Sequence, residues 1–270
     1  MTTLTILLAL VIAHFATGLA SLRRYDPVVA ALTAAQKPVV ARWPEQGWLG
    51  VLVLVVIVAL ISVLAELLAS ALLGSFGLFL LALVVLLYTL GPDDLDIELG
   101  KLARTEDDDE RNRRISDFGH TDLPPAARTF RAALYRWFGV IFWFALLGIA
   151  GALLFRLAEQ ARDSDEALPE NLAGAMERLR AVLAWPVAQL MSLALMLVAD
   201  FDRSWRAWKQ WLNENGWLTP GDGMLLAAGE QAVAPDEPIP AMLRALELCW
   251  RMLITWLVVL SVMLIVGWIA

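Results

Sequence analysis

Glu66 is an acidic residue inside a long apolar segment, where an ionisable side chain is rare. Ser62 and Ser70 stand four residues before and after it, a spacing that places all three on one face of a helix. An acid at membrane depth normally faces protein or water rather than lipid, which makes Glu66 a candidate functional residue. The alternative is a structural hydrogen-bonding role, because Glu66 lies only about two helical turns from the turn sequence at 74–77.

Acidic clusters at 93–96 and 106–110 are a second place where the residue types suit a chemical role. Mg²⁺ sites need only one or two carboxylates together with substrate phosphates, so either cluster contains enough carboxylates for one. Basic residues at 111–114 follow directly, and mixed charge of this kind is also typical of a solvated helix face. The sequence predicts the solvated face, with the metal site as its alternative.

Histidine and cysteine are too scarce to build a shared metal site or a disulfide framework. The chain contains two histidines, His14 and His120, and one cysteine, Cys249. Zinc sites combine three or four such ligands, and one thiol forms no bridge within a chain. Cys249 is therefore expected to pack as a small apolar residue. We expect no resident cofactor or metal.

The composition is that of an integral membrane protein. Of the 270 residues, 59% are hydrophobic, which exceeds the roughly 45–50% of soluble domains. The net charge of −7 argues against nucleic acid as a partner, because phosphate neutralisation requires a clustered basic surface. The expected partner is the lipid bilayer. The first apolar segment has its arginines after it rather than before it, which disfavours a cleaved signal peptide.

Residues 134–156 form the central apolar run, with Arg136 and Arg156 near its two ends. A helix of this length is roughly 34 Å long, enough to cross a hydrocarbon core of about 30 Å. We expect a transmembrane helix whose arginines extend toward opposite interfaces. The alternative is that the small residues from Gly148 to Gly151 break it into a re-entrant pair buried in protein.

The expected fold class is all-α: a single polytopic helical membrane domain over residues 1–270, without an evident internal repeat. Residues 200–217 place aromatic residues on one face, which predicts an amphipathic helix lying in the membrane interface. Residues 218–240 are rich in glycine and proline and are expected to be loop. About six membrane segments are expected, at 4–22, 49–73, 76–90, 134–156, 182–199 and 249–269.

The distribution of lysine and arginine predicts the orientation of these segments, because positive loops stay in the cytoplasm. Residues 23–47 and the loops 91–133 and 200–248 are expected to be cytoplasmic, with both termini periplasmic, in a bacterial inner membrane. Residues 157–181 are periplasmic if the central helix is continuous. They are cytoplasmic if it is re-entrant.

Several landmarks follow one another along the chain: ERNRRIS (110–116), GHTD (119–122), IFWFALLGIAGALLFR (141–156), MERLRAVLAWPVAQL (176–190) and NENGW (213–217). In this order they resemble the AmpE family of bacterial inner-membrane proteins. They are also similar to the CobD/CbiB cobinamide-phosphate synthases of cobalamin assembly, to which AmpE is itself similar. The resemblance covers about residues 85–225, with a weaker match in the N-terminal segment.

Similarity to AmpE implies a non-catalytic regulatory or sensor-type protein linked to β-lactamase induction and muropeptide recycling. Its implied partner is a small cell-wall-derived ligand or another protein. Similarity to the synthases implies the alternative, a membrane-embedded enzyme that acts on a corrinoid and a phosphorylated amino alcohol. The candidate functional residues are Glu66, Arg114, His120, Arg156, Asn215, Gly216 and Trp217.

Asn215, Gly216 and Trp217 close the expected amphipathic helix. Gly216 suits the left-handed conformation that ends many helices, and Trp217 suits a membrane interface. We expect this corner to hold the 200–248 loop against the 91–133 loop and to form a ligand or partner cleft there. The alternative is a helix stop with an interfacial tryptophan.

Departures from the synthase pattern favour the regulatory role. Residues 131–136 stand where the synthases resemble ENTVDG, so both carboxylates and the amide are replaced. Glu159 and Arg162 likewise stand at an asparagine and an aspartate of the synthases. A site for Mg²⁺ and a nucleotide needs oxygen ligands, so these differences predict the loss of synthase chemistry.

Overall fold

The computed structural model describes residues 2–15, 46–90, 95–105, 107–118, 122–160, 170–233 and 237–265, together with the single positions 34, 36, 38 and 42. These residues form helices joined by short connections, and no strand occurs in the described ranges. Four of the described helices are long and apolar enough to cross a membrane. The expected all-α, polytopic membrane fold is therefore confirmed.

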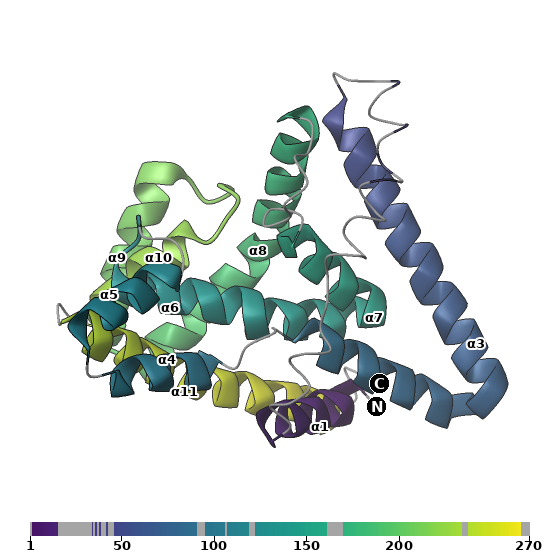
Figure 1. Cartoon of the computed structure of the whole chain (residues 1–270), viewed down its shortest axis with the longest axis horizontal. Coiled ribbons are helices and arrows are strands. Elements are labelled where there is room, and N and C mark those ends of the chain that lie inside the picture. Colours follow the sequence, from purple (N-terminus) through teal and green to yellow (C-terminus); the bar gives the residue numbers. More distant parts are fainter. Residues whose placement is uncertain are drawn as a thin grey trace. The chain divides into compact units, whose positions relative to one another are not determined.

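The chain divides into two compact units. The first contains mainly residues 1–92 and 139–183, and the second contains residues 93–138 and 184–266. In chain order the elements are α1 (Thr2–Phe15), α3 (Gly47–Thr89), α4 (Leu95–Arg104), α5 (Asp108–Asp117), α6 (Pro125–Ala133), the short π-helix η2 (Leu134–Phe138), α7 (Gly139–Gln160), α8 (Glu170–Val198), α9 (Phe201–Asn215), α10 (Gly223–Val233) and α11 (Pro238–Ile265) (Figure 1).

Helix α3 folds back on itself at Gly74. The backbone there has φ 59° and ψ −140°, a conformation that residues with a Cβ rarely adopt. Two arms result, residues 47–73 and 75–89, which correspond to the segments expected at 49–73 and 76–90 (Figure 1). Because Gly74 has no Cβ, the chain reverses here without steric strain.

Helix α7 contains a second break, at Gly148, where φ is 62° and ψ is −146°. Gly151 then lies so close to the Trp143 carbonyl that an added Cβ would be 2.2 Å from its oxygen. In a straight helix, residues eight positions apart are separated by about 12 Å, so the chain has reversed. The expectation of one continuous helix over 134–156 is therefore wrong. The break lies where the re-entrant alternative requires it.

The turns at Gly74 and Gly148 are built alike. The sequence Leu-Leu-Gly-Ser-Phe-Gly at 72–77 corresponds to Leu-Leu-Gly-Ile-Ala-Gly at 146–151. Gly77 repeats the close approach, since an added Cβ would lie 2.2 Å from the carbonyl oxygen eight residues earlier. The two turns therefore share the local pattern Leu-Leu-Gly-x-x-Gly, and the absence of a longer internal repeat stays a prediction.

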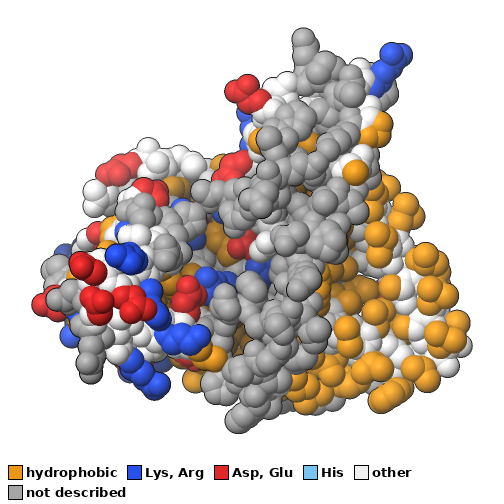
Figure 2. All heavy atoms as spheres, in the orientation of Figure 1, with side chains coloured by type: hydrophobic (Ala, Val, Ile, Leu, Met, Phe, Trp, Pro, Cys, Tyr) orange, Lys and Arg blue, Asp and Glu red, His pale blue; other side chains and the backbone are white. Residues whose placement is uncertain are grey.

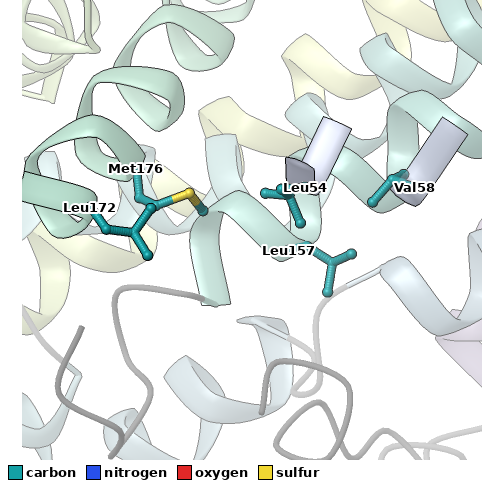
Figure 3. Close-up of a cluster of buried hydrophobic side chains, with 5 residues drawn as sticks. All are labelled: Leu54, Val58, Leu157, Leu172 and Met176. Carbon is teal, nitrogen blue, oxygen red and sulfur yellow. The ribbon is translucent and has the colours of Figure 1, made fainter. Parts of the chain in front are cut away.

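The hydrophobic core of the first unit joins α3, α7 and α8. Leu54 and Val58 of α3 form a buried cluster with Leu157 of α7 and with Leu172 and Met176 of α8 (Figure 3). Much of the remaining surface of α3 exposes large apolar side chains, which cover this helix in Figure 2. A surface of this kind suits contact with lipid, as expected of a membrane segment.

In the second unit α6 packs against α10 and α11, and α9 packs against α10. Phe130 of α6 is fully buried, and an added Cβ on Gly229 of α10 would lie 2.4 Å from its ring. A larger residue at 229 would therefore separate the two helices. This contact brings segments far apart in the sequence together, and a cleft opens beside it.

Three helix boundaries differ from those expected. Helix α10 lies within residues 218–240, and the expectation of loop is wrong there because Met224 and Leu225 are fully buried. Glycine and proline on both sides of this short helix are typical of loops, so the pattern does not reveal it. Helices α8 and α11 begin before the apolar segments expected at 182–199 and 249–269, because the earlier parts of both helices include charged side chains such as Arg178 in α8 and Arg244 in α11.

Candidate functional site

A cleft with a volume of about 820 Å³ lies within the second unit, between parts of the 91–133 and 200–248 segments. Its volume falls in the range of about 300–1,000 Å³ that is usual for small-molecule sites. The walls come from the start of α6, one face of α9, the second half of α10 and the start of α11. The polar lining residues are Arg203, Arg206, Gln210, Glu214, Glu230 and Gln231.

Helix α9 supplies most of the polar wall. It begins at Phe201 because the Asp200 carboxylate accepts the backbone N–H of Arg203 at 3.1 Å. Steps of three or four residues then bring Arg203, Gln210 and Glu214 to the same side of the helix. The amphipathic helix expected over 200–217 is thus present as α9, and its polar face borders the cleft.

The charges of the cleft are balanced, with two arginines, two glutamates and two glutamines in its lining. Arg203 lies 3.4 Å from the Asp200 carboxylate, and Arg206 donates from Nε to the Asp202 carbonyl at 3.0 Å. A purely anionic ligand would meet carboxylates as well as guanidinium groups. The lining therefore suits a ligand that carries both charges or several amide groups.

Trp211 gives the cleft an apolar wall. An added Cβ on Gly223 would lie 2.6 Å from the Trp211 ring, so a glycine at the start of α10 allows this close packing. Pro124 and Pro125 line the cleft from the start of α6. Together with the polar face of α9, this wall favours an amphipathic ligand.

A bidentate ion pair joins the two segments that border the cleft. Arg131 of α6 donates from Nε and Nη2 to the two carboxylate oxygens of Asp222, at 2.7 and 2.9 Å. Asp222 is 6% exposed, and its carbonyl also accepts the N–H groups of Leu225 and Leu226 at the start of α10. The pair therefore fixes α10 to α6. Neither residue is among the candidates predicted from the sequence, although Gly221 and Gly223 indicate that Asp222 lies in a turn.

The acidic residues of α4 are engaged by partners inside the second unit. Glu98 accepts from Nη1 of Arg136 at 2.5 Å. Both carboxylate oxygens of Asp96 accept from Nε1 of Trp250, at 2.8 and 2.9 Å, and the Trp250 ring packs against Trp137 with 5.2 Å between centroids. These contacts attach α4 to η2 and α11. The solvated face predicted for the 93–96 cluster is therefore wrong for Asp96.

Asn215, Gly216 and Trp217 form the C-terminal corner of α9. Gly216 has φ 90°, and its N–H donates to the Leu212 carbonyl at 2.8 Å, as expected of a helix end. Trp217 accepts a hydrogen bond at its carbonyl from Trp185 Nε1 at 3.3 Å. The corner lies beside the cleft rather than lining it, since Glu214 is the last α9 residue in the lining.

Arg114 and His120 belong to the segment between α4 and α6. Arg114 is exposed and pairs with Glu110 on its own helix, with Nη2 and Oε1 separated by 2.5 Å. His120 lies outside the described residues, as does the side chain of His14. The structure therefore places Arg114 on a helix surface.

Arg156 and Glu66 belong to the first unit. Arg156 is only 1% exposed; it donates from Nε to the Thr89 carbonyl at 2.7 Å and from Nη1 to Glu159. The expectation that Arg156 extends to an interface is wrong, because the C-terminal carbonyls of α3 offer a buried site that favours a cation. Glu66 is exposed. Its carboxylate lies close to the turn, because a Cβ atom added to Gly148 would be 4.0 Å from Glu66 Oε1. The other described candidates, Arg114 and 215–217, belong to the second unit.

Comparisons with known proteins find one partial similarity. The chain is 31% identical over 101 residues to the cobalamin biosynthesis protein CobD of Chromobacterium violaceum. The match covers 36% of this chain and 31% of CobD, so it spans less than a third of the length of that relative. No family model and no solved structure matches the chain. The similarity to CobD proteins is thus supported, whereas the resemblance to AmpE finds no support in these comparisons.

Proposed function

We propose that this chain is a multi-pass protein of a bacterial inner membrane that binds an amphipathic small molecule in the cleft between α6, α9 and α10. The observation that carries this proposal is the cleft itself, with an apolar Trp211 wall and a polar α9 face. A rigid ion pair between Arg131 and Asp222 holds its sides together. A preformed cavity of this kind is the usual form of a small-molecule site.

A role in cobalamin biosynthesis is the function that the comparison favours. The CobD relative is named for that process. The resemblance to the cobinamide-phosphate synthases suggests a corrinoid ligand, which is a large molecule with many amide groups. The amides and balanced charges of the cleft suit such a ligand. In this role the chain acts as a membrane-embedded, cobinamide-phosphate synthase-like enzyme, the alternative drawn from the sequence.

A regulatory role of the AmpE type is the second candidate, and the surroundings of residues 131–136 favour it. Arg131 and Arg136 are engaged in ion pairs, while Ala133, Leu134 and Tyr135 are buried. This segment therefore contributes packing where the synthase pattern has carboxylates. A fold can keep its packing after its site is lost, so the cleft would then bind an effector without transforming it.

Complementation separates the two roles. A strain lacking its cobinamide-phosphate synthase is transformed with this chain, and an immunoblot confirms that the chain is expressed. Restored cobalamin-dependent growth would establish the enzymatic role. An expressed chain that restores no growth would contradict it and leave the regulatory role.

Binding to the cleft is tested directly with purified protein in detergent and cobinamide as the probe, measured by equilibrium dialysis. Ala207 lines the cleft, so Ala207→Trp is expected to fill it and weaken binding at least about tenfold, the equivalent of about 1.4 kcal/mol. Lys209→Trp places the same bulk on an exposed side of α9 and should leave binding unchanged. Equal affinities in both variants would locate the binding elsewhere. If the wild-type chain does not bind cobinamide, the same comparison with an anhydromuropeptide tests the regulatory role.

A further inference from the structure

One face of the first α3 arm contains polar side chains, and one of them lies near the glycine turn of α7. Val58, Ser62 and Glu66 follow one another at steps of four residues and therefore share a helix face. Val58 belongs to the buried cluster that contains Leu157 of α7. Glu66 lies near the turn, with Oε1 4.0 Å from the position of an added Cβ on Gly148. Ser62 lies between these two contacts on the same helix face.

Ser62 and Glu66 both lack a hydrogen-bond partner among the residues that the structure describes. Ser62 is 2% exposed, and its Oγ is buried without a hydrogen bond. Buried hydroxyl groups in proteins almost always have such a partner. Glu66 likewise makes no hydrogen bond or ion pair within the described ranges. Two oxygen-bearing side chains on adjacent turns are therefore available to a ligand.

Arg156, which carries the positive charge of α7, has partners other than Glu66. Arg156 follows Gly148 by eight residues, which corresponds to about 12 Å along a helix. Its guanidinium group donates to the Thr89 carbonyl and to Glu159. A carboxylate in an apolar membrane segment normally pairs with an opposite charge, so Glu66 calls for a cation from outside the chain.

The backbone at Gly148 supplies further oxygen atoms. The first arm of α7 ends at Leu147, and the last carbonyl groups of any helix lack donors within that helix. Interrupted helices at membrane depth use such carbonyls, together with side-chain oxygens, to coordinate sodium ions. A single carboxylate balances one positive charge, whereas calcium requires six to eight oxygen ligands and usually several carboxylates.

We propose that Glu66, Ser62 and the backbone of the Gly148 turn bind a small monovalent cation of the sodium type. Glu66 neutralises the ion, Ser62 contributes an uncharged oxygen, and the end of the first α7 arm contributes carbonyl oxygens. The ion would join the two hairpins, because its ligands come from α3 and from α7.

The test measures thermal unfolding of the purified full chain in detergent, with sodium chloride replaced stepwise by choline chloride at constant ionic strength. Sodium is expected to raise Tm in a saturable manner. Glu66→Gln should abolish this rise, and Ser62→Ala should increase the sodium concentration at its midpoint severalfold. Ser70→Ala is the matched control, because Ser70 lies one turn beyond Glu66, is exposed, and should leave the midpoint unchanged.

Size-exclusion chromatography checks that each variant is folded. If Glu66→Gln fails to fold, the comparison of Ser62→Ala with Ser70→Ala decides the question. A wild-type chain whose Tm responds to pH but not to sodium or potassium would overturn the proposal. An unchanged sodium midpoint in Ser62→Ala, or a full sodium response in Glu66→Gln, would overturn it as well.

Discussion

Arg131 and Asp222 are 91 positions apart in the chain, yet they form the most complete ion pair beside the cleft. Their side chains are 16% and 9% exposed, so each charge depends on the other rather than on water. The paired N–H groups of a guanidinium fit both oxygens of a carboxylate, which fixes orientation as well as distance. This pair therefore determines how α10 lies against α6.

Replacement of Asp222 by alanine is expected to lower the free energy of unfolding by about 3 kcal/mol, because Arg131 loses its bidentate partner in a partly buried site. The measurement is urea unfolding in detergent, followed by tryptophan fluorescence. Glu110→Ala removes the partner of Arg114 on an exposed helix surface and should cost less than about 1 kcal/mol. Equal losses in the two variants would show that the cleft pair adds nothing beyond a surface contact.

At the scale of elements, the recurring feature is a helix that reverses at a glycine. Gly74 and Gly148 differ by only 3° in φ, 59° against 62°, and by 6° in ψ, −140° against −146°. In both cases the glycine three residues later packs on a carbonyl of the preceding arm. Glycine is required at both positions of each turn, the first for its backbone angles and the second for the close approach.

Gly148→Ala is expected to destabilise the protein by about 1–3 kcal/mol, the cost of holding a residue with a Cβ in this part of conformational space. Gly174→Ala is the matched control in α8, since an added Cβ there meets nothing within 4 Å. Alanine favours a helix over glycine, so this control should be neutral or stabilised by up to about 1 kcal/mol. Thermal unfolding of both variants provides the measurement. A Gly148→Ala variant as stable as Gly174→Ala would argue against the turn.

At the scale of the whole molecule, the contacts within the second unit restrict the membrane topology. Arg131 contacts Asp222, so we expect the segments 91–133 and 200–248 to lie on the same side of the membrane. A chain that reverses at Gly148 returns to the side from which it entered. With residues 91–133 and 200–248 on one side, this path requires helix α8 to make no net crossing, although α8 is long and apolar enough to cross a membrane. The break in α7 therefore favours the re-entrant arrangement, in which residues 157–181 lie on the same side as residues 91–133.

We expect residues 157–181 to be on the same side as residues 91–133. The test replaces Cys249 by alanine and introduces single cysteines at Ala173 and at Ser116, which are both exposed. An impermeant thiol reagent applied to intact cells or spheroplasts should label neither position. Permeabilisation should expose both. Labelling at position 173 alone before permeabilisation would restore the six-segment arrangement and contradict the re-entrant one.

Local patterns in the sequence are sufficient for the class of fold and for several of its elements. Long apolar runs determine an all-α membrane protein, because lipid offers no partner for backbone groups and a helix satisfies its own. The α3 hairpin and helix α9 also follow from neighbouring residues, the first from Gly74 between two apolar runs and the second from Asp200 and its aromatic spacing. Each of these depends on residues close together in the chain.

Only the tertiary structure decides the features that join distant segments. The run at 134–156 suits a straight helix and a reversed one equally, and packing around Gly148 and Gly151 selects the reversed form. A cleft between the two large loops was expected, yet its lining residues on α9 and α10 were not among the candidates. Their role depends on where α10 packs, and that contact joins residues about ninety positions apart. Periodicity describes one helix at a time, whereas a site requires the faces of several helices to meet.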